Sequence, residues 1–153
     1  MERAIELANR AAALDEVPVG AVIYRGAEII AEAHNTRETD ADPVGHAELL
    51  AIRLAARRLG RWRLSGCSLA VTLEPCPMCA GALVNARIDR LVYGARDPKA
   101  GACGSLFRIP TDVRLNHRVE IIEGVMAKEC GKLLTDFFRT KRQLTRERRA
   151  KAG

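Results

Sequence analysis

Three residues with the chemistry of metal ligands stand in two short motifs of the sequence. His46 belongs to His-Ala-Glu, and Cys76 and Cys79 belong to Pro-Cys-Pro-Met-Cys, which begins about 30 positions further on. An imidazole and two thiolates suit zinc, and the two thiolates cancel the charge of the ion. Three protein ligands leave the fourth tetrahedral position open for water, as in catalytic zinc sites. We therefore expect one Zn²⁺ ion held by His46, Cys76 and Cys79.

Glu48 is the candidate for moving protons, because it lies two residues after His46. A carboxylate near the start of a helix is mildly stabilising by itself, so an isolated glutamate there needs no further role. Beside a metal the interpretation changes, since a water molecule activated by the ion needs a base to take its proton. Residues i and i+2 do not share a helix face, so the pair must lie in the irregular first turn of a helix.

The remaining histidines and cysteines have simpler explanations. Either His34 or His117 is an alternative fourth ligand, and would convert the site into a closed structural one. Five cysteines are an odd number, and a chain of 153 residues is large enough to fold without disulfides. We expect Cys67, Cys103 and Cys130 to be buried thiols that pack as small hydrophobes.

The hydrophobic patterns around the motifs predict helices at residues 1–14, 46–59, 76–86 and about 125–149, and strands at 17–24, 27–33, 68–73, 90–95 and 119–122. The segment 94–104, with three glycines and a proline, is predicted to be a functional loop. Elements in this order predict an α/β domain with helices packed on a mixed sheet. Both metal motifs then lie where a helix begins.

The net charge of +6 is concentrated at the C-terminal end of the chain. Residues 139–153 hold seven basic residues and one acidic residue, so the preceding part is neutral overall. We divide the chain into a domain over residues 1–142 and a basic tail over 143–153, which continues the last helix or is disordered. Terminal charge runs are often only solvated. Here Phe138 precedes the tail, and an aromatic ring beside cations can stack on an unpaired base while the cations meet phosphates.

The sequence does not have the pattern of a membrane protein. It contains no run of roughly 18 apolar residues that could cross a bilayer. Acidic residues occur near its start, where a secretory signal would be apolar. We expect a soluble, cytoplasmic protein.

The two metal motifs resemble those of the cytidine/deoxycytidylate deaminase-like superfamily. Further segments resemble one branch of it, the bacterial tRNA-specific adenosine deaminases. That narrower resemblance covers Val17–Ala21, Asn35, Leu91–Asp97, Lys99–Gly101, Asn116–Glu120 and Asp136–Arg139. The segments 36–42 and 108–115 depart from the pattern of the family.

The resemblance implies a three-layer α-β-α fold, with a five-stranded mixed sheet flanked by helices. It also implies hydrolysis of a C–N bond in a cyclic amidine, converting adenosine to inosine at the wobble position of an arginine tRNA anticodon. Glu48 would take the proton of water, protonate the ring nitrogen and assist the departure of ammonia. The partners would be a tRNA anticodon stem-loop and a second copy of the chain, with one Zn²⁺ per subunit. The residues that match the RNA-binding positions or the adjoining cations are Asn35, Ala47, Leu73, Asp97, Lys99, Asn116, Phe138, Arg139 and Arg142.

Two other functions share part of these features. A deaminase of free bases or nucleosides, of the guanine or cytosine type, has the same zinc chemistry but no need for a basic tail. A non-catalytic zinc module that binds RNA would hold the metal with four protein ligands.

Overall fold

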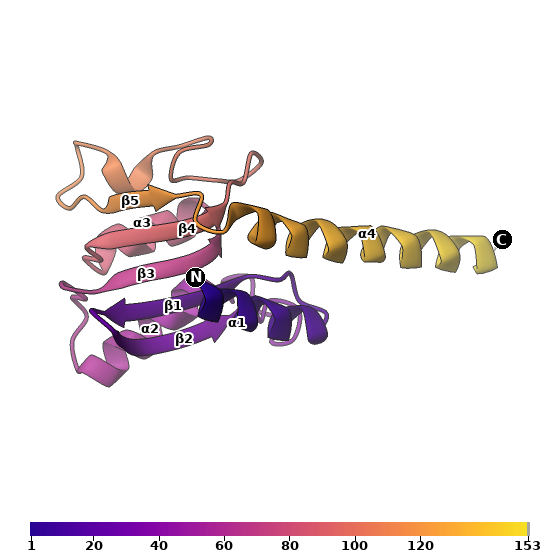
Figure 1. The fold of residues 1–153 in the computed structure, drawn as a ribbon, viewed down its shortest axis with the longest axis horizontal. Helices are drawn as coiled ribbons and strands as arrows, with labels where there is room; N and C mark the ends of the chain where they lie inside the picture. The colour runs from indigo at the N-terminus through magenta and orange to yellow at the C-terminus, as the bar shows by residue number, and fades with distance from the viewer. Residues whose placement is uncertain (153) are drawn as a thin grey trace.

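Five strands form one mixed sheet in the order β2-β1-β3-β4-β5 (Figure 1). The structure is a computed structural model that describes residues 1–152, without the side chain of residue 152. β1 pairs antiparallel with β2 and with β3, whereas β3, β4 and β5 are parallel. The strands are β1 (Gly20–Arg25), β2 (Glu28–His34), β3 (Ser68–Leu73), β4 (Arg90–Ala95) and β5 (Glu120–Glu123).

Four α-helices cover the two faces of the sheet, which gives the three layers predicted (Figure 1). α1 (Glu2–Ala13) and α4 (Ala127–Ala152) contact each other and pack on one face. α2 (Ala47–Leu59) and α3 (Pro77–Asn85) pack on the other, with the short 3₁₀ helix η1 (Ile109–Thr111) beside α3. The predicted α/β class and element order are confirmed.

The largest difference from the predicted strand boundaries is at β1, which begins at Gly20 and not at Val17. Pro18 lies between these residues and has no N–H to donate to a strand ladder. Val17 and Val19 instead reach a cavity beside the sheet. The other predicted strands are shifted by at most one residue at either end.

α2 and α3 each begin directly after a candidate metal ligand. His46 has an extended conformation directly before α2, and Cys76 has one directly before α3. Pro77 is tolerated at the first position of α3, because the N–H it lacks would have no partner in the helix. α2 ends at Gly60, whose positive φ of 63° is the left-handed conformation typical of a helix C-terminus.

The core lies on both sides of the central strands and contains the three cysteines outside the motif. Cys67, Cys103 and Cys130 are buried, as predicted. Gly94 in β4 allows α4 to pack closely, because a Cβ atom there would lie 2.4 Å from Sγ of Cys130. The start of α4 is therefore held tightly against the sheet.

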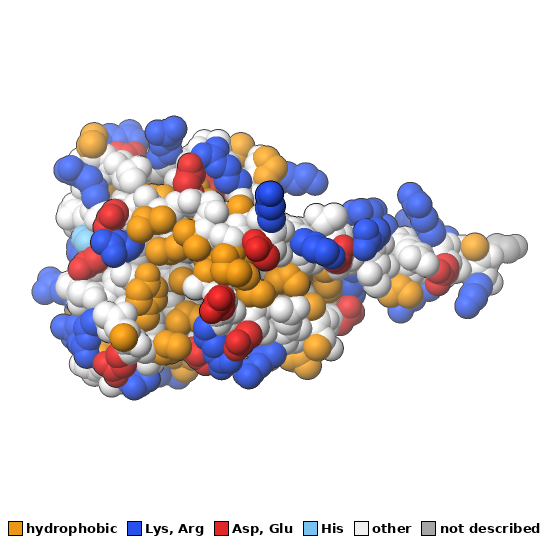
Figure 2. All heavy atoms as spheres, viewed as in Figure 1, with side chains coloured by type: hydrophobic (Ala, Val, Ile, Leu, Met, Phe, Trp, Pro, Cys, Tyr) orange, Lys and Arg blue, Asp and Glu red, His pale blue; other side chains and the backbone are white. Residues whose placement is uncertain are grey.

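The second half of α4 projects beyond the rest of the molecule (Figure 1). Residues 142–151 are all exposed, and Lys and Arg side chains follow this part of the helix (Figure 2). No described helix combines the length and apolar character needed to cross a membrane.

Candidate active site

The two sequence motifs meet at the ends of α2 and α3. Nδ1 of His46 lies 3.7 Å from Sγ of Cys76 and 3.5 Å from Sγ of Cys79. The three ligand atoms lie within 4.8 Å of one another. Around a tetrahedral zinc ion, nitrogen and sulfur ligands would lie about 3.6 Å apart, given bond lengths of roughly 2.0 and 2.3 Å. The three side chains therefore have the spacing needed to hold a metal ion.

The protonation of the two thiols is coupled. A hydrogen bond from Cys79 lowers the pKa of Cys76 to about 4, and the contact with Cys76 raises the pKa of Cys79. The contact with Cys76 also raises the pKa of His46. A divalent cation would hold both sulfurs as thiolates, because the deprotonated form is the one that binds metal.

The two histidines considered as fourth ligands lie apart from this group. Nδ1 of His34 is 2.9 Å from the carbonyl oxygen of Asn35, and Nε2 of His117 is 2.7 Å from that of Ile88. Within the part of the chain that the structure describes, the metal-ligating group consists of His46, Cys76 and Cys79 alone. Three ligands leave one tetrahedral position for another molecule, which argues against the closed structural site.

Glu48 lies in the first turn of α2, beside the ligands, and does not belong to the ligand group. Its side chain is only 4% exposed, and this burial raises the pKa of Glu48 to about 7. The carboxyl group nevertheless borders the cavity next to the ligands. A buried carboxyl group that faces a cavity is placed to take and return a proton.

Asn35 connects the end of β2 to the start of α2. Its Oδ1 accepts a hydrogen bond of 3.0 Å from the backbone N–H of Ala47. Because the oxygen is used in this way, the amide NH₂ is the end available to the cavity that Asn35 lines. Ala47 is completely buried behind it and does not line the cavity.

A cavity of about 710 Å³ opens in front of the ligands. This is ample for a purine base with its neighbouring groups. Val17, Val19 and Leu73 form an apolar part of its wall, and several arginine and lysine side chains also line it. The lining residues are Val17, Val19, Asn35, Arg37, His46, Glu48, Leu73, Glu74, Cys76, Arg96, Asp97, Pro98, Lys99, Ala100, Leu134, Thr135, Phe138 and Arg142.

Most of the predicted RNA-binding residues come together at this cavity. Asn35, Leu73, Asp97, Lys99, Phe138 and Arg142 line it. Phe138 is 44% exposed, so its ring is accessible for stacking on a base, as predicted from its position beside the cations. Asn116 and Arg139 are exposed and outside the lining, and Arg139 pairs with Asp136 at 2.8 Å.

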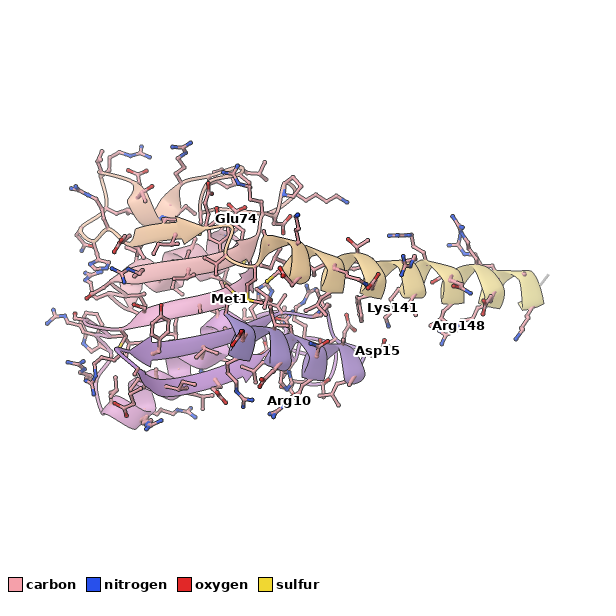
Figure 3. All side chains as sticks on the ribbon, viewed as in Figure 1. Met1, Arg10, Asp15, Glu74, Lys141 and Arg148 are labelled. Atoms are coloured by element: carbon pink, nitrogen blue, oxygen red, sulfur yellow. The ribbon has the colours of Figure 1, made fainter. Side chains whose placement is uncertain are left out.

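A buried glutamate holds the loop that carries Asp97 and Lys99. Glu74 is 2% exposed and lies at the edge of the sheet where β3 ends (Figure 3). One carboxylate oxygen accepts hydrogen bonds from the backbone N–H groups of Cys103 and Ser105, at 3.1 and 2.9 Å. The other accepts from the N–H of Asp97 at 2.9 Å and from the Ser105 hydroxyl at 2.5 Å. Glu74 is therefore hydrogen-bonded to the loop, and along the chain it is separated from Cys76 only by Pro75.

A second buried glutamate holds another loop that contributes to the cavity wall. Glu16 is 1% exposed, and its Oε1 accepts a hydrogen bond of 2.6 Å from the N–H of Thr39. The segment around Thr39 carries Arg37, which lines the cavity. Sequence reasoning missed Glu16, Glu74 and Arg37. The available signal was a carboxylate within an otherwise apolar stretch, as in the run from Ser68 through Cys76.

Fold and site together are those of the deaminases with a cytidine-deaminase-like fold. Residues 1–142 match the family model of MafB19-like deaminases. A guanine deaminase from Bacillus subtilis, known from its structure, is 42% identical to this chain with a TM-score of 0.62. The match covers 68% of this chain and 67% of that one.

The more specific relationship comes from longer matches. A tRNA-specific adenosine deaminase of Bacillus subtilis is 50% identical over 143 residues, which cover 94% of this chain and 89% of the relative. A solved structure from a study of A-to-I editing by tRNA:A34 deaminases at the wobble position is 42% identical, with a TM-score of 0.84. That match covers 88% of this chain and 97% of the other. The chain belongs to the family of tRNA-specific adenosine deaminases.

Proposed function

We propose that this protein converts adenosine to inosine at the wobble position of a tRNA anticodon, with an arginine tRNA as substrate. The observation that carries the proposal is the position of the His46, Cys76 and Cys79 group. It lies beside a buried carboxyl group and opens into a base-sized cavity with a basic rim. Because the proposed substrate is a tRNA, we propose that the enzyme acts in the cytoplasm.

The metal that we propose is Zn²⁺, one per subunit, held by His46, Cys76 and Cys79. Two sulfur ligands and one imidazole favour zinc over the harder cations, which prefer oxygen. When bound, zinc supplies a Lewis acid that lowers the pKa of water and so provides a nucleophile near neutral pH.

Glu48 performs the proton transfers in the proposed reaction. It takes a proton from the attacking water, delivers it to the ring nitrogen next to C6, and then assists the amino group to leave as ammonia. Water thus adds its oxygen at C6, the C6–N bond breaks, and adenosine and water yield inosine and ammonia. Burial keeps Glu48 close to the reacting atoms and away from bulk solvent.

The cavity wall provides the contacts that an unpaired purine needs. The amide NH₂ of Asn35 faces the cavity and can donate to an acceptor atom of the base. Leu73 provides apolar surface for the ring, and Phe138 stands at the rim, where it can stack on a neighbouring base. Lys99 and Arg142 can pair with phosphates there.

We also propose that two copies of the chain form a homodimer through α3. Its sequence, Pro-Met-Cys-Ala-Gly-Ala-Leu-Val-Asn, has a single polar side chain, although a surface helix normally has a polar outer face. Met78, Gly81 and Ala82 remain partly exposed on it. The adjoining segment around η1 exposes Leu106 and Phe107, each at 54%. Leu83 and Val84 on the inner face of α3 belong to the core of the subunit.

The proposed reaction is tested by offering the zinc-loaded protein four substrates: an arginine anticodon stem-loop with adenosine at the wobble position, free adenosine, free cytidine and free guanine. We expect inosine from the stem-loop and at least ~100-fold lower kcat/KM for each small molecule, because free bases and nucleosides have no phosphates for the basic rim to bind. A stem-loop with the adenosine moved by one position is the matched control. Efficient deamination of a free base or nucleoside would identify a small-molecule deaminase instead.

A further inference from the structure

The projecting half of α4 carries charge that the proposed reaction at the cavity does not use. The family model ends at residue 142, whereas the helix continues to Ala152. Arg146 and Arg149 lie in this extension and are exposed. Neither Arg146 nor Arg149, nor Arg142 before them, forms a salt bridge with an acidic side chain of residues 1–151.

Helix geometry places these arginines in line with the cavity. Leu134, Phe138 and Arg142 line the cavity and recur every four residues, so they define one face of α4. Arg146 follows Arg142 by four residues and Arg149 follows it by seven, which turns them only about 40° and 20° from Arg142 around the helix axis and keeps both on its side. The cavity wall therefore continues as a row of three arginines about 10 Å long, at 1.5 Å per residue.

The side of the extension that is turned away from these three arginines carries different neighbours. Lys141 forms an ion pair with Asp15 at the end of α1, and Arg148 lies seven residues further along the same side (Figure 3). Lys151 and Glu147 are also turned away from the arginine row, at about 100° of rotation per residue. This side thus has two exposed cations, Arg148 and Lys151, each turned at least about 100° around the helix from every arginine of the row.

We propose that Arg142, Arg146 and Arg149 form a phosphate-binding row for the RNA backbone that leaves the cavity beside the target base. This inference rests on the proposed function, because the RNA must first place its unpaired base in the cavity. RNA is the occupant that the charges favour, since a row of unpaired cations complements a regularly spaced row of phosphates. The neutral body of the chain provides no comparable excess of charge.

The test compares two double variants with equal loss of charge in the full-length, zinc-loaded protein. Arg146→Gln with Arg149→Gln removes two cations of the row. Arg148→Gln with Lys151→Gln removes two cations from the side turned away from the row. Glutamine keeps the helix, because its helix propensity is close to that of arginine and lysine. Affinity for an anticodon stem-loop is measured from ~50 to ~200 mM salt, together with turnover at saturating RNA.

We expect the row variant to bind the stem-loop about 5- to 20-fold more weakly at ~100 mM salt. The slope of log affinity against log salt should fall by about 1.5, since each lost phosphate contact removes roughly 0.7–0.9. The control variant should change affinity less than ~2-fold, and both variants should retain the wild-type kcat. If both variants bound the stem-loop equally weakly, the attraction would be diffuse and the proposed row would be wrong. The proposal would also be wrong if neither variant bound more weakly than wild type. Failure of the proposed function would give a different result, because the wild-type protein itself would then not deaminate the stem-loop at saturating concentration.

Discussion

At the scale of single residues, the site depends on where its polar groups are buried. Glu48 is almost fully enclosed, yet it faces the cavity beside the metal-ligating group. Asn35 uses one end of its amide to hold the first turn of α2, which leaves the other end for a ligand. Asn35 thus combines a structural contact with a donor available to the cavity, and Glu48 combines burial with access to the same cavity.

Replacing Glu48 with glutamine should abolish turnover without releasing the metal. Glutamine has nearly the same volume but cannot take a proton from water, so kcat should fall by roughly 10²–10⁴-fold. Zinc content, measured by mass spectrometry of the purified variant, should stay near one ion per subunit. Turnover within a few-fold of wild type would show that another group moves the protons.

Replacing Asn35 with aspartate separates its two contacts. A carboxylate can still accept the hydrogen bond from Ala47 N–H, so the free energy of unfolding should change by less than about 1 kcal/mol. The donor toward the base is lost, so kcat/KM on the stem-loop should fall by roughly 5- to 150-fold, or about 1–3 kcal/mol. Asn35→Ala is the comparison, and should lose stability as well as activity. Unchanged kcat/KM in the aspartate variant would remove Asn35 from base recognition.

At the scale of elements, two buried glutamates hold two loops that contribute residues to the cavity wall. Glu74 binds backbone groups of residues 97–105, and Glu16 binds that of Thr39. Gly101 leaves room for the Glu74 carboxylate, because a Cβ atom there would lie 2.3 Å from Oε2. These contacts keep Lys99 and Arg37 near the metal-ligating group although both lie on loops.

The change Glu74→Gln should release the loop of residues 97–105. All four groups that contact the Glu74 carboxylate donate hydrogen bonds to it. The amide NH₂ of glutamine cannot accept, so at least one backbone N–H of the loop would lose its partner. The expected cost is about 1–3 kcal/mol in stability. We expect KM for the stem-loop to rise more than kcat falls, with the metal content unchanged.

Ser105→Ala is the matched control for this loop, since it removes only one of the four hydrogen bonds. Its effect on KM should be correspondingly smaller. A Glu74→Gln protein with wild-type KM, or one whose KM change is equalled by Ser105→Ala, would contradict the proposed anchoring of the loop.

At the scale of the whole molecule, a neutral body carries a basic helical arm and an apolar helix at its surface. The arm extends the wall of the cavity, while α3 lies in the layer on the opposite side of the sheet. We propose different contacts for the two features, RNA for the arm and a second subunit for α3.

The proposed dimer is tested by Gly81→Glu on the outer side of α3. A Cβ atom at Gly81 meets no atom within 4 Å in the isolated subunit, so the variant should fold normally. A charged side chain there would prevent another copy from packing closely, and the sedimentation mass should fall from that of a dimer to that of a monomer. Gly131→Glu on α4, which is equally unobstructed, is the control and should remain dimeric. A dimeric Gly81→Glu protein would place the interface elsewhere.

Local sequence was sufficient for the element order and the metal ligands. Periodicity and turn residues act over a few positions, so strands 68–73 and 90–95 were predicted with their observed bounds. His46, Cys76 and Cys79 were identifiable as candidate ligands because a zinc site requires particular residue types in short motifs, which can be read without knowledge of the fold.

Only the tertiary structure decided what surrounds those ligands. Packing of α2 and α3 on one sheet brings together side chains 30 residues apart, and long-range hydrogen bonds from Glu16 and Glu74 set the loops. The tertiary structure also places Arg37 in the cavity wall and Asn116 outside that wall. Such positions depend on contacts between distant segments, which no local pattern encodes. The sequence thus determined the chemistry of this protein, and the fold determined the shape of the surface on which a substrate meets it.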